Sequence, residues 1–77
     1  MTTLITQNSD YRVSDGVCVA VRPHSEVDWR TRHPAVGQRL LGALSLGVRF
    51  AYSKLPKIGM RVVFSNDVMT SPLIAIR

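Results

Sequence analysis

The side chains that could act in catalysis or metal binding are few. They are one cysteine, two histidines and four acidic residues in the first half of the chain, namely Cys18, His24, His33, Asp10, Asp15, Glu26 and Asp28. A hydrolytic or metal mechanism needs ligands that converge, or a base held beside a nucleophile. The cysteine and the histidines do not have metal-ligand spacing. The sequence therefore predicts a protein that is not an enzyme and that holds no cofactor or metal.

Each of these residues also has a structural interpretation. Cys18 lies within an alternating apolar stretch, where a cysteine serves as a small buried hydrophobe. His24 lies in a predicted loop, and His33 precedes a proline at the start of a predicted helix. No glycine-rich segment matches a nucleotide-binding fingerprint. We therefore look for function in binding.

The chain has a net charge of +5, and its cations are gathered in one segment. Residues 29–66 contain seven basic side chains and no acidic one, whereas residues 1–28 contain two basic and four acidic ones. Such an unopposed cationic segment favours an anionic partner, which could be nucleic acid, an acidic protein surface or a phosphorylated ligand. The alternative is a solvated surface that only keeps a small protein soluble.

We predict that these cations form one contact surface with Trp29 as its aromatic member. Eight arginines against two lysines favour forked recognition of phosphate or carboxylate groups. Phe50 and Tyr52 alternate with Val48, which predicts that they face the core. Trp29 has a second interpretation as a cap over the edge of a small core. The predicted binding residues are Trp29, Arg30, Arg32, Arg39, Arg49, Lys54, Lys57 and Arg61.

The favoured function is that of a small basic binding or regulatory protein whose partner is nucleic acid. An inhibitor or adaptor that binds an acidic patch on a host protein fits nearly as well. A third possibility is an oligomeric protein that sequesters a nucleotide-like ligand. Salt dependence separates these functions, because nucleic-acid binding weakens steeply with salt and a mainly apolar protein interface does not.

Apolar alternation and turn residues predict mainly antiparallel strands. The predicted strands cover residues 3–6, 11–13, 17–22, 48–53, 60–65 and 68–76. The dipeptide Asp15-Gly16 tolerates positive φ and predicts a hairpin before the third strand. In that strand, Val17, Val19 and Val21 are predicted to share one face.

The middle of the chain predicts the single helix. Pro34 suits the first position of a helix, and Val36, Leu40 and Leu44 follow at a spacing of four residues. The predicted fold is therefore α+β and mainly antiparallel β, a small barrel or roll with one short helix at about residues 34–46.

The last predicted strand contains Thr70-Ser71-Pro72, which is unusual in a segment that is apolar enough for a core. Proline has no amide hydrogen, so it lies at a strand edge or a bulge rather than in a fully paired strand. We therefore predict that the strand bends here and crosses a barrel corner or changes its pairing partner. A binding notch lined by backbone is the functional alternative.

Two windows near the ends of the chain follow short patterns, N-S-x-Y-x-V and T-S-P-(V/L)-x-x-I. The matching residues are Asn8, Ser9, Tyr11 and Val13, then Gly59, Thr70, Ser71, Pro72, Leu73 and Ile76. In these windows the chain resembles short uncharacterised proteins of bacteriophages and actinobacterial genomes. The resemblance implies an origin in a phage or mobile element and a compact β fold, and it implies no activity.

Length and composition bound the remaining properties. A chain of 77 residues has room for a single small domain over residues 1–77. Its thin core favours self-association, so we expect a homo-oligomer. The N-terminus does not resemble a signal peptide, and the longest uncharged apolar run, 40–48, falls short of the roughly 20 residues of a membrane span. We therefore expect a cytoplasmic protein without a membrane partner.

Overall fold

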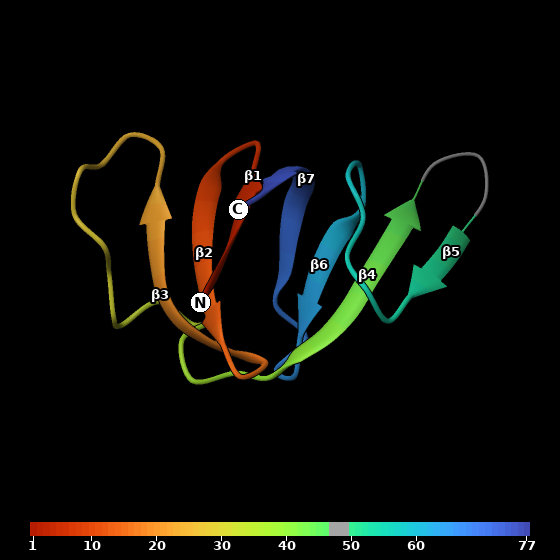
Figure 1. Ribbon diagram of the computed structural model, residues 1–77, viewed down its shortest axis with the longest axis horizontal. Coiled ribbons are helices and arrows are strands. Elements are labelled where there is room, and N and C mark those ends of the chain that lie inside the picture. The colour runs from red at the N-terminus through yellow and green to blue at the C-terminus, as the bar shows by residue number, and fades with distance from the viewer. Residues whose placement is uncertain (47–49) are drawn as a thin grey trace.

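The computed structural model describes residues 1–46 and 50–77, which form one antiparallel sheet of seven strands (Figure 1). The strands are β1 (Thr2–Thr6), β2 (Ser9–Ser14), β3 (Val17–Pro23), β4 (Leu40–Leu46), β5 (Phe50–Ser53), β6 (Arg61–Phe64) and β7 (Met69–Ile76). Their order across the sheet is β3-β2-β1-β7-β6-β4-β5. The prediction of mainly antiparallel strands is confirmed. Within the described residues there is no helix of the length and apolarity that a membrane span needs.

The predicted helix at residues 34–46 is wrong. Residues 34–37 form a turn, and Leu40–Leu46 is β4. β4 lies between β5 and β6 and pairs with both. A glycine at position 42 costs a helix about 1 kcal/mol relative to alanine, whereas the two neighbouring strands supply backbone partners along β4. Pairing with distant segments therefore overrides the local helical spacing.

The predicted barrel is also wrong, although the sheet is curled. The rings of Tyr11 on β2 and Phe64 on β6 have centroids 5.7 Å apart, whereas three strand spacings in a flat sheet amount to roughly 14 Å. The start of β3 also reaches the segment before β4 through a bridge between Val17 and Arg39. Among the described strands, however, the end strands β3 and β5 do not pair with each other, so the sheet remains open.

The buried apolar residues that the structure describes form a hydrophobic core inside the curl. Its members are Leu4, Tyr11, Val13, Cys18, Val21, Ala35, Val62, Phe64 and Leu73. Ala35 belongs to residues 24–39, which we call the β3–β4 loop, and it is completely buried. The β3–β4 loop therefore contributes to the core as well as to the surface.

The hairpin of β2 and β3 forms as predicted, but the faces of β3 differ from the prediction. Asp15 and Gly16 have φ angles of 51° and 77°, as a tight turn requires. The register shifts at a bulge, where Val19 has no partner on β2. As a result Val19 is 37% exposed, while Cys18 and Val21 are completely buried. The prediction of a buried Cys18 is confirmed, and burial raises the pKa of its thiol.

β7 changes its pairing partner at the Thr-Ser-Pro sequence, as predicted. Met69 and Pro72 pair with β6, whereas Leu73, Ala75 and Ile76 pair with β1. The register shifts on both sides of this point. β7 therefore joins two half-sheets, one of β1, β2 and β3 and the other of β4, β5 and β6.

Side-chain hydroxyls bond the backbone where β7 changes partner. The Val62 amide donates to Thr70 Oγ1 at 3.0 Å. Thr6 Oγ1 donates to the Ser9 carbonyl at 2.7 Å and accepts from the Ser9 amide at 3.2 Å and from Ser71 Oγ at 2.9 Å. Thr6 and Thr70 are buried, and every buried side-chain nitrogen or oxygen in the described part of the chain has a partner. These polar residues therefore have a structural role in this junction.

Candidate functional site

The predicted binding residues lie in two parts of the fold. The members in the β3–β4 loop are Trp29, Arg30, Arg32 and Arg39, and those in the other half are Lys54 and Lys57 after β5 and Arg61 on β6. Arg49 lies outside the described residues. β3 and β5 are the end strands and lie at opposite ends of the long axis of the molecule, which extends over 35 Å (Figure 1). The predicted residues therefore come from two cationic groups along the chain, one in the β3–β4 loop and one in residues 54–61.

Few of these cations are paired with carboxylates. Among the described residues, the ion pairs are Arg22 with Asp10, His24 with Asp10 and Arg30 with Glu26. Of the predicted binding residues that the structure describes, only Arg30 is neutralised in this way. Arg32, Arg39, Lys54 and Lys57 are exposed. These four cations can therefore meet an external anion.

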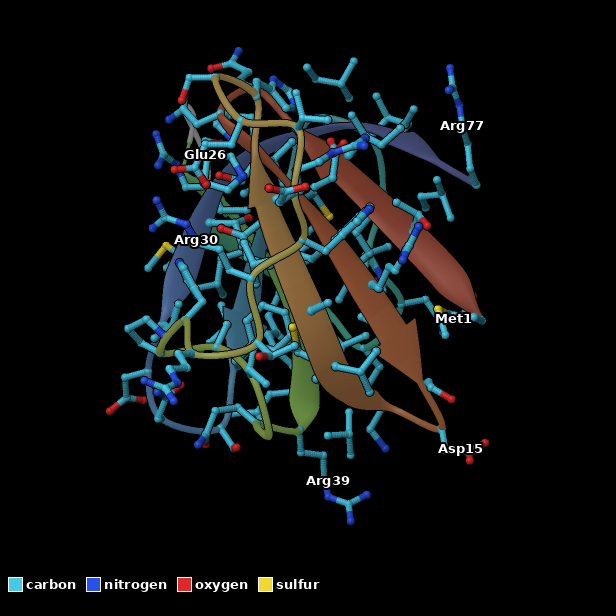
Figure 2. All side chains as sticks on the ribbon, turned by 90° about the vertical axis from the view of Figure 1, so that its left-hand side faces the viewer. Met1, Asp15, Glu26, Arg30, Arg39 and Arg77 are labelled. Atoms are coloured by element: carbon cyan, nitrogen blue, oxygen red, sulfur yellow. The ribbon has the colours of Figure 1, made fainter. Side chains whose placement is uncertain are left out.

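The β3–β4 loop is held against the free edge of β3 by backbone hydrogen bonds. Val21 and Arg30 exchange two bonds, of 2.9 and 2.7 Å. The Gly37 amide donates to the Cys18 carbonyl at 2.8 Å. Figure 2 shows Glu26 and Arg30 along the same side of the molecule, with Arg39 at its lower end. The loop therefore covers a sheet edge and presents its side chains from a fixed backbone.

Trp29 contacts two arginines that the sequence analysis left out of the site. The guanidinium carbon of Arg12 lies 3.8 Å from the centroid of the Trp29 ring, and that of Arg22 lies 4.7 Å from it. Stacking uses the flat face of a guanidinium group and leaves the N–H donors at its edge available for hydrogen bonds, one of which Arg22 donates to Asp10. Trp29 therefore orients cationic donors. This cluster could have been predicted from the register of the β2–β3 hairpin.

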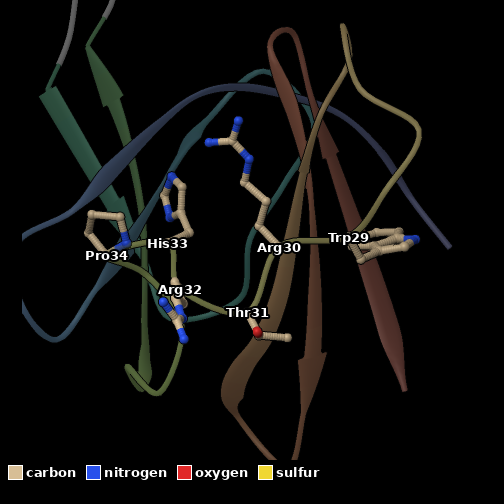
Figure 3. Close-up of a pocket in the computed structure, with 6 residues that line it drawn as sticks. All are labelled: Trp29, Arg30, Thr31, Arg32, His33 and Pro34. Carbon is tan, nitrogen blue, oxygen red and sulfur yellow. The ribbon is translucent and has the colours of Figure 1, made fainter.

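The β3–β4 loop also forms an open cavity of about 430 Å³ (Figure 3). Its lining residues are Trp29, Arg30, Thr31, Arg32, His33 and Pro34. In Figure 3 the side chains of Arg30 and His33 extend to one side of the loop, and those of Thr31 and Arg32 extend to the other. The Arg30 Nε donates to Glu26 Oε2 at 2.7 Å. An anion that reached Arg30 would therefore compete with Glu26.

His33 is a neutral hydrogen-bond donor at this cavity. Its Nδ1 accepts a bond from the Ala35 amide at 3.0 Å, and its ring meets Tyr11 edge-on with centroids 6.0 Å apart. Burial lowers the pKa of His33, and the charge of Arg30 lowers it further. The ring is therefore unprotonated at neutral pH, with its remaining hydrogen on Nε2.

Tyr52 points outward, contrary to the prediction that it faces the core. Tyr52 is 56% exposed, and its hydroxyl donates to the Leu41 carbonyl at 2.7 Å. Tyr52 pairs with Leu44, and Leu44 pairs with Arg61, so all three side chains share one face of the sheet. The buried Ala43 and Val62 lie on the opposite face, so alternation along β5 indicates which side chains share a face but not which face is buried. The side chain of Phe50 lies outside the described part.

A second cavity, of about 320 Å³, has no charged lining residue. Leu4 and Val13 form its floor, and Leu55, at 76% exposure, lies at its rim. Because no charged side chain lines this cavity, it is not a candidate site for an anion.

Comparisons of the chain with protein-family models, with curated proteins and with solved structures gave no match. The resemblance to short proteins of bacteriophages and actinobacterial genomes therefore stays a prediction. Two residues of the resembling pattern, Thr70 and Ser71, take part in the hydroxyl contacts of β7.

Asp10 is a buried carboxylate that ties the β3–β4 loop to the sheet. It accepts a hydrogen bond from Arg22 Nη2 and another from His24 Nε2, each at 2.8 Å. Burial raises the pKa of Asp10, but the hydrogen bonds and charges of Arg22 and His24 outweigh it. The net pKa lies below the ordinary value of 3.8.

We expect the Asp10 contacts to be lost in acid. A carboxyl whose pKa is lower in the folded state contributes stability that is full above its unfolded pKa and disappears as the pH falls through the folded pKa. The free energy of unfolding of the Asp10→Asn variant should therefore fall less between pH 5 and pH 2 than that of the wild type. At pH 7 the variant should be less stable by about 1 to 3 kcal/mol.

The matched control is Asp15→Asn, which changes an exposed carboxylate in a turn that asparagine tolerates. Urea titrations at each pH measure both variants. An Asp10→Asn variant with the acid dependence of Asp15→Asn would show that the Asp10 pairs do not stabilise the fold.

Proposed function

We propose that this chain is a small non-enzymatic binding protein whose partner is an anion, with nucleic acid as the favoured class. A phage or mobile-element origin, implied by the resemblance, belongs to the same proposal. The observation that carries it is the unopposed charge of residues 29–66, where only Arg30 among the described predicted residues has a carboxylate partner.

The distribution of exposed cations over two segments of the chain favours a long polyanion. Arg32 lies in the connection after β3 and Lys57 in the connection after β5, and β3 and β5 are the end strands of the sheet in a molecule 35 Å long. A nucleotide-like ligand contacts only a few neighbouring side chains, whereas about ten nucleotides of one strand in a duplex cover the length of the molecule. This argument supports nucleic acid over the sequestered small ligand.

The test is a titration of labelled oligonucleotides at 50 and 200 mM salt. If four phosphates are contacted, affinity should fall roughly 100-fold between these salt concentrations. The double variant Arg32→Gln and Lys57→Gln removes one exposed cation from each group. It should bind more weakly and reduce the slope of log affinity against log salt by about 2.

The control variant is Arg77→Gln, which changes a cation outside the predicted set and should leave the salt slope unchanged. Absence of binding to any oligonucleotide at 50 mM salt would contradict the nucleic-acid proposal. That result would favour the alternative partner, an acidic patch on a host protein.

A further inference from the structure

Tyr52 is an aromatic side chain that is both fixed and accessible. Its hydroxyl bonds the Leu41 carbonyl, and its ring lies over Gly42, whose missing side chain leaves the necessary space. A Cβ atom at Gly42 would lie 2.9 Å from Cε2 and 2.7 Å from the hydroxyl oxygen of Tyr52. More than half of the residue is nevertheless exposed. A ring ordered in advance loses little conformational freedom when a ligand stacks on it.

The surroundings of Tyr52 are cationic and apolar. Leu44 lies beside it in the register, and Arg61 lies one strand further, at roughly 10 Å across two strand spacings. Arg61 Nη1 donates to the Thr70 carbonyl at 3.5 Å. Arg61 has no carboxylate partner among the described residues. Lys54 follows β5 directly and is exposed.

We infer that the outer face of β4, β5 and β6 binds single-stranded nucleic acid, with a base stacked on Tyr52 and a phosphate held by Arg61. The inference rests on the proposed function and adds to it a strand class and a stacking residue. A base inside a duplex cannot expose its flat face to a side chain, so stacking on Tyr52 selects unpaired bases. Base stacking on an aromatic side chain accounts for roughly 5- to 150-fold in affinity.

A pair of variants separates the ring from its hydroxyl. Tyr52→Leu removes the aromatic face, and Tyr52→Phe keeps the face but removes the bond to Leu41. With a labelled oligothymidine at 50 mM salt, Tyr52→Leu should bind at least about fivefold more weakly than the wild type. Tyr52→Phe should bind within about twofold of it. Neither variant should change the salt slope, because neither removes a charge.

Arg61→Gln completes the set, since it should reduce the salt slope by about 1. Thermal unfolding identifies a temperature at which every variant is folded, and all titrations are made there. Amide chemical-shift changes on adding oligothymidine to the wild type provide a second measurement, and they should be largest around Tyr52 and Arg61.

The outcomes distinguish the two proposals. Binding of no oligonucleotide would remove the proposed function and this inference together. Salt-dependent binding that Tyr52→Leu leaves unchanged, or affinity for a duplex equal to that for a single strand, would overturn the inference alone. Shift changes confined to the β3–β4 loop would also overturn it.

Discussion

The Thr6→Val variant is expected to lose about 2 to 4 kcal/mol of unfolding free energy, although valine has nearly the same shape as threonine. The Thr6 hydroxyl is completely buried and serves both the amide and the carbonyl of Ser9 as well as the Ser71 hydroxyl. Valine would leave these groups without their partner at the junction of β1 and β7. In a domain of this size a loss of 3 kcal/mol lowers the thermal midpoint by roughly 12 to 24 °C.

The control for this prediction is Thr6→Ser, which keeps the hydroxyl and removes one buried methyl group. It should cost only about 1 kcal/mol. Urea unfolding followed by the fluorescence of Trp29 measures both variants. A Thr6→Val variant as stable as Thr6→Ser, or more stable, would contradict the prediction that the hydroxyl contributes more to the junction than the methyl group.

The Gly42→Ala variant is expected to lose about 3 kcal/mol and to bind single strands more weakly. The added Cβ would lie 2.5 Å from the backbone oxygen of Ser53 and 2.7 Å from the hydroxyl of Tyr52. A backbone atom cannot move aside as a flexible side chain does, so β5 must separate from β4 or Tyr52 must leave its place. Loss of the Tyr52 position then removes the proposed stacking face.

Gly37→Ala is the matched control for this substitution. Gly37 has a φ of 85°, and nothing lies within 4 Å of a Cβ added there. Alanine at this position should lower the unfolding free energy by only about 1 kcal/mol, because the left-handed backbone conformation is its only unfavourable feature. Unfolding and oligonucleotide titrations compare the two variants. Gly42→Ala should have the lower unfolding free energy and the lower affinity for the oligonucleotide. If the two variants lost equal stability, the close approach of β5 to Gly42 would not exist in solution.

Local chemistry was sufficient to predict some of the fold. Asp15-Gly16 predicted a hairpin because these residues tolerate the positive φ that the turn adopts. Pro72 predicted a change of pairing partner because proline has no amide hydrogen to donate to a neighbouring strand. In the register, Pro72 pairs with β6 and Leu73 pairs with β1. In both cases the information lies in the residues themselves.

Two features could not be predicted because they depend on distant residues. Leu40 and Leu44 satisfy a helical spacing, but pairing with β6, some twenty residues later, makes this segment a strand. Val19 lies at a bulge, and simple alternation along β3 contains no sign of the extra residue. Its position depends on how β3 aligns with β2.

The candidate site was predicted only in part for the same reason. Trp29 was singled out by its residue type, but its contacts with Arg12 and Arg22 were not predicted, because these arginines belong to a stretch whose linear charge balance is acidic. Only the folded hairpin brings them to the indole ring. Counting charges along the chain also could not show that Glu26 neutralises Arg30.

The central place of β7 in the sheet constrains how the molecule is made. During synthesis on a ribosome, residues 69–76 emerge after every other strand, yet they lie between β1 and β6. Until then the edges of β1 and β6 have no neighbour and can pair with other nascent chains. The sheet is therefore complete only after residues 69–76 have been made, and the folding yield should depend on how quickly this strand inserts relative to aggregation.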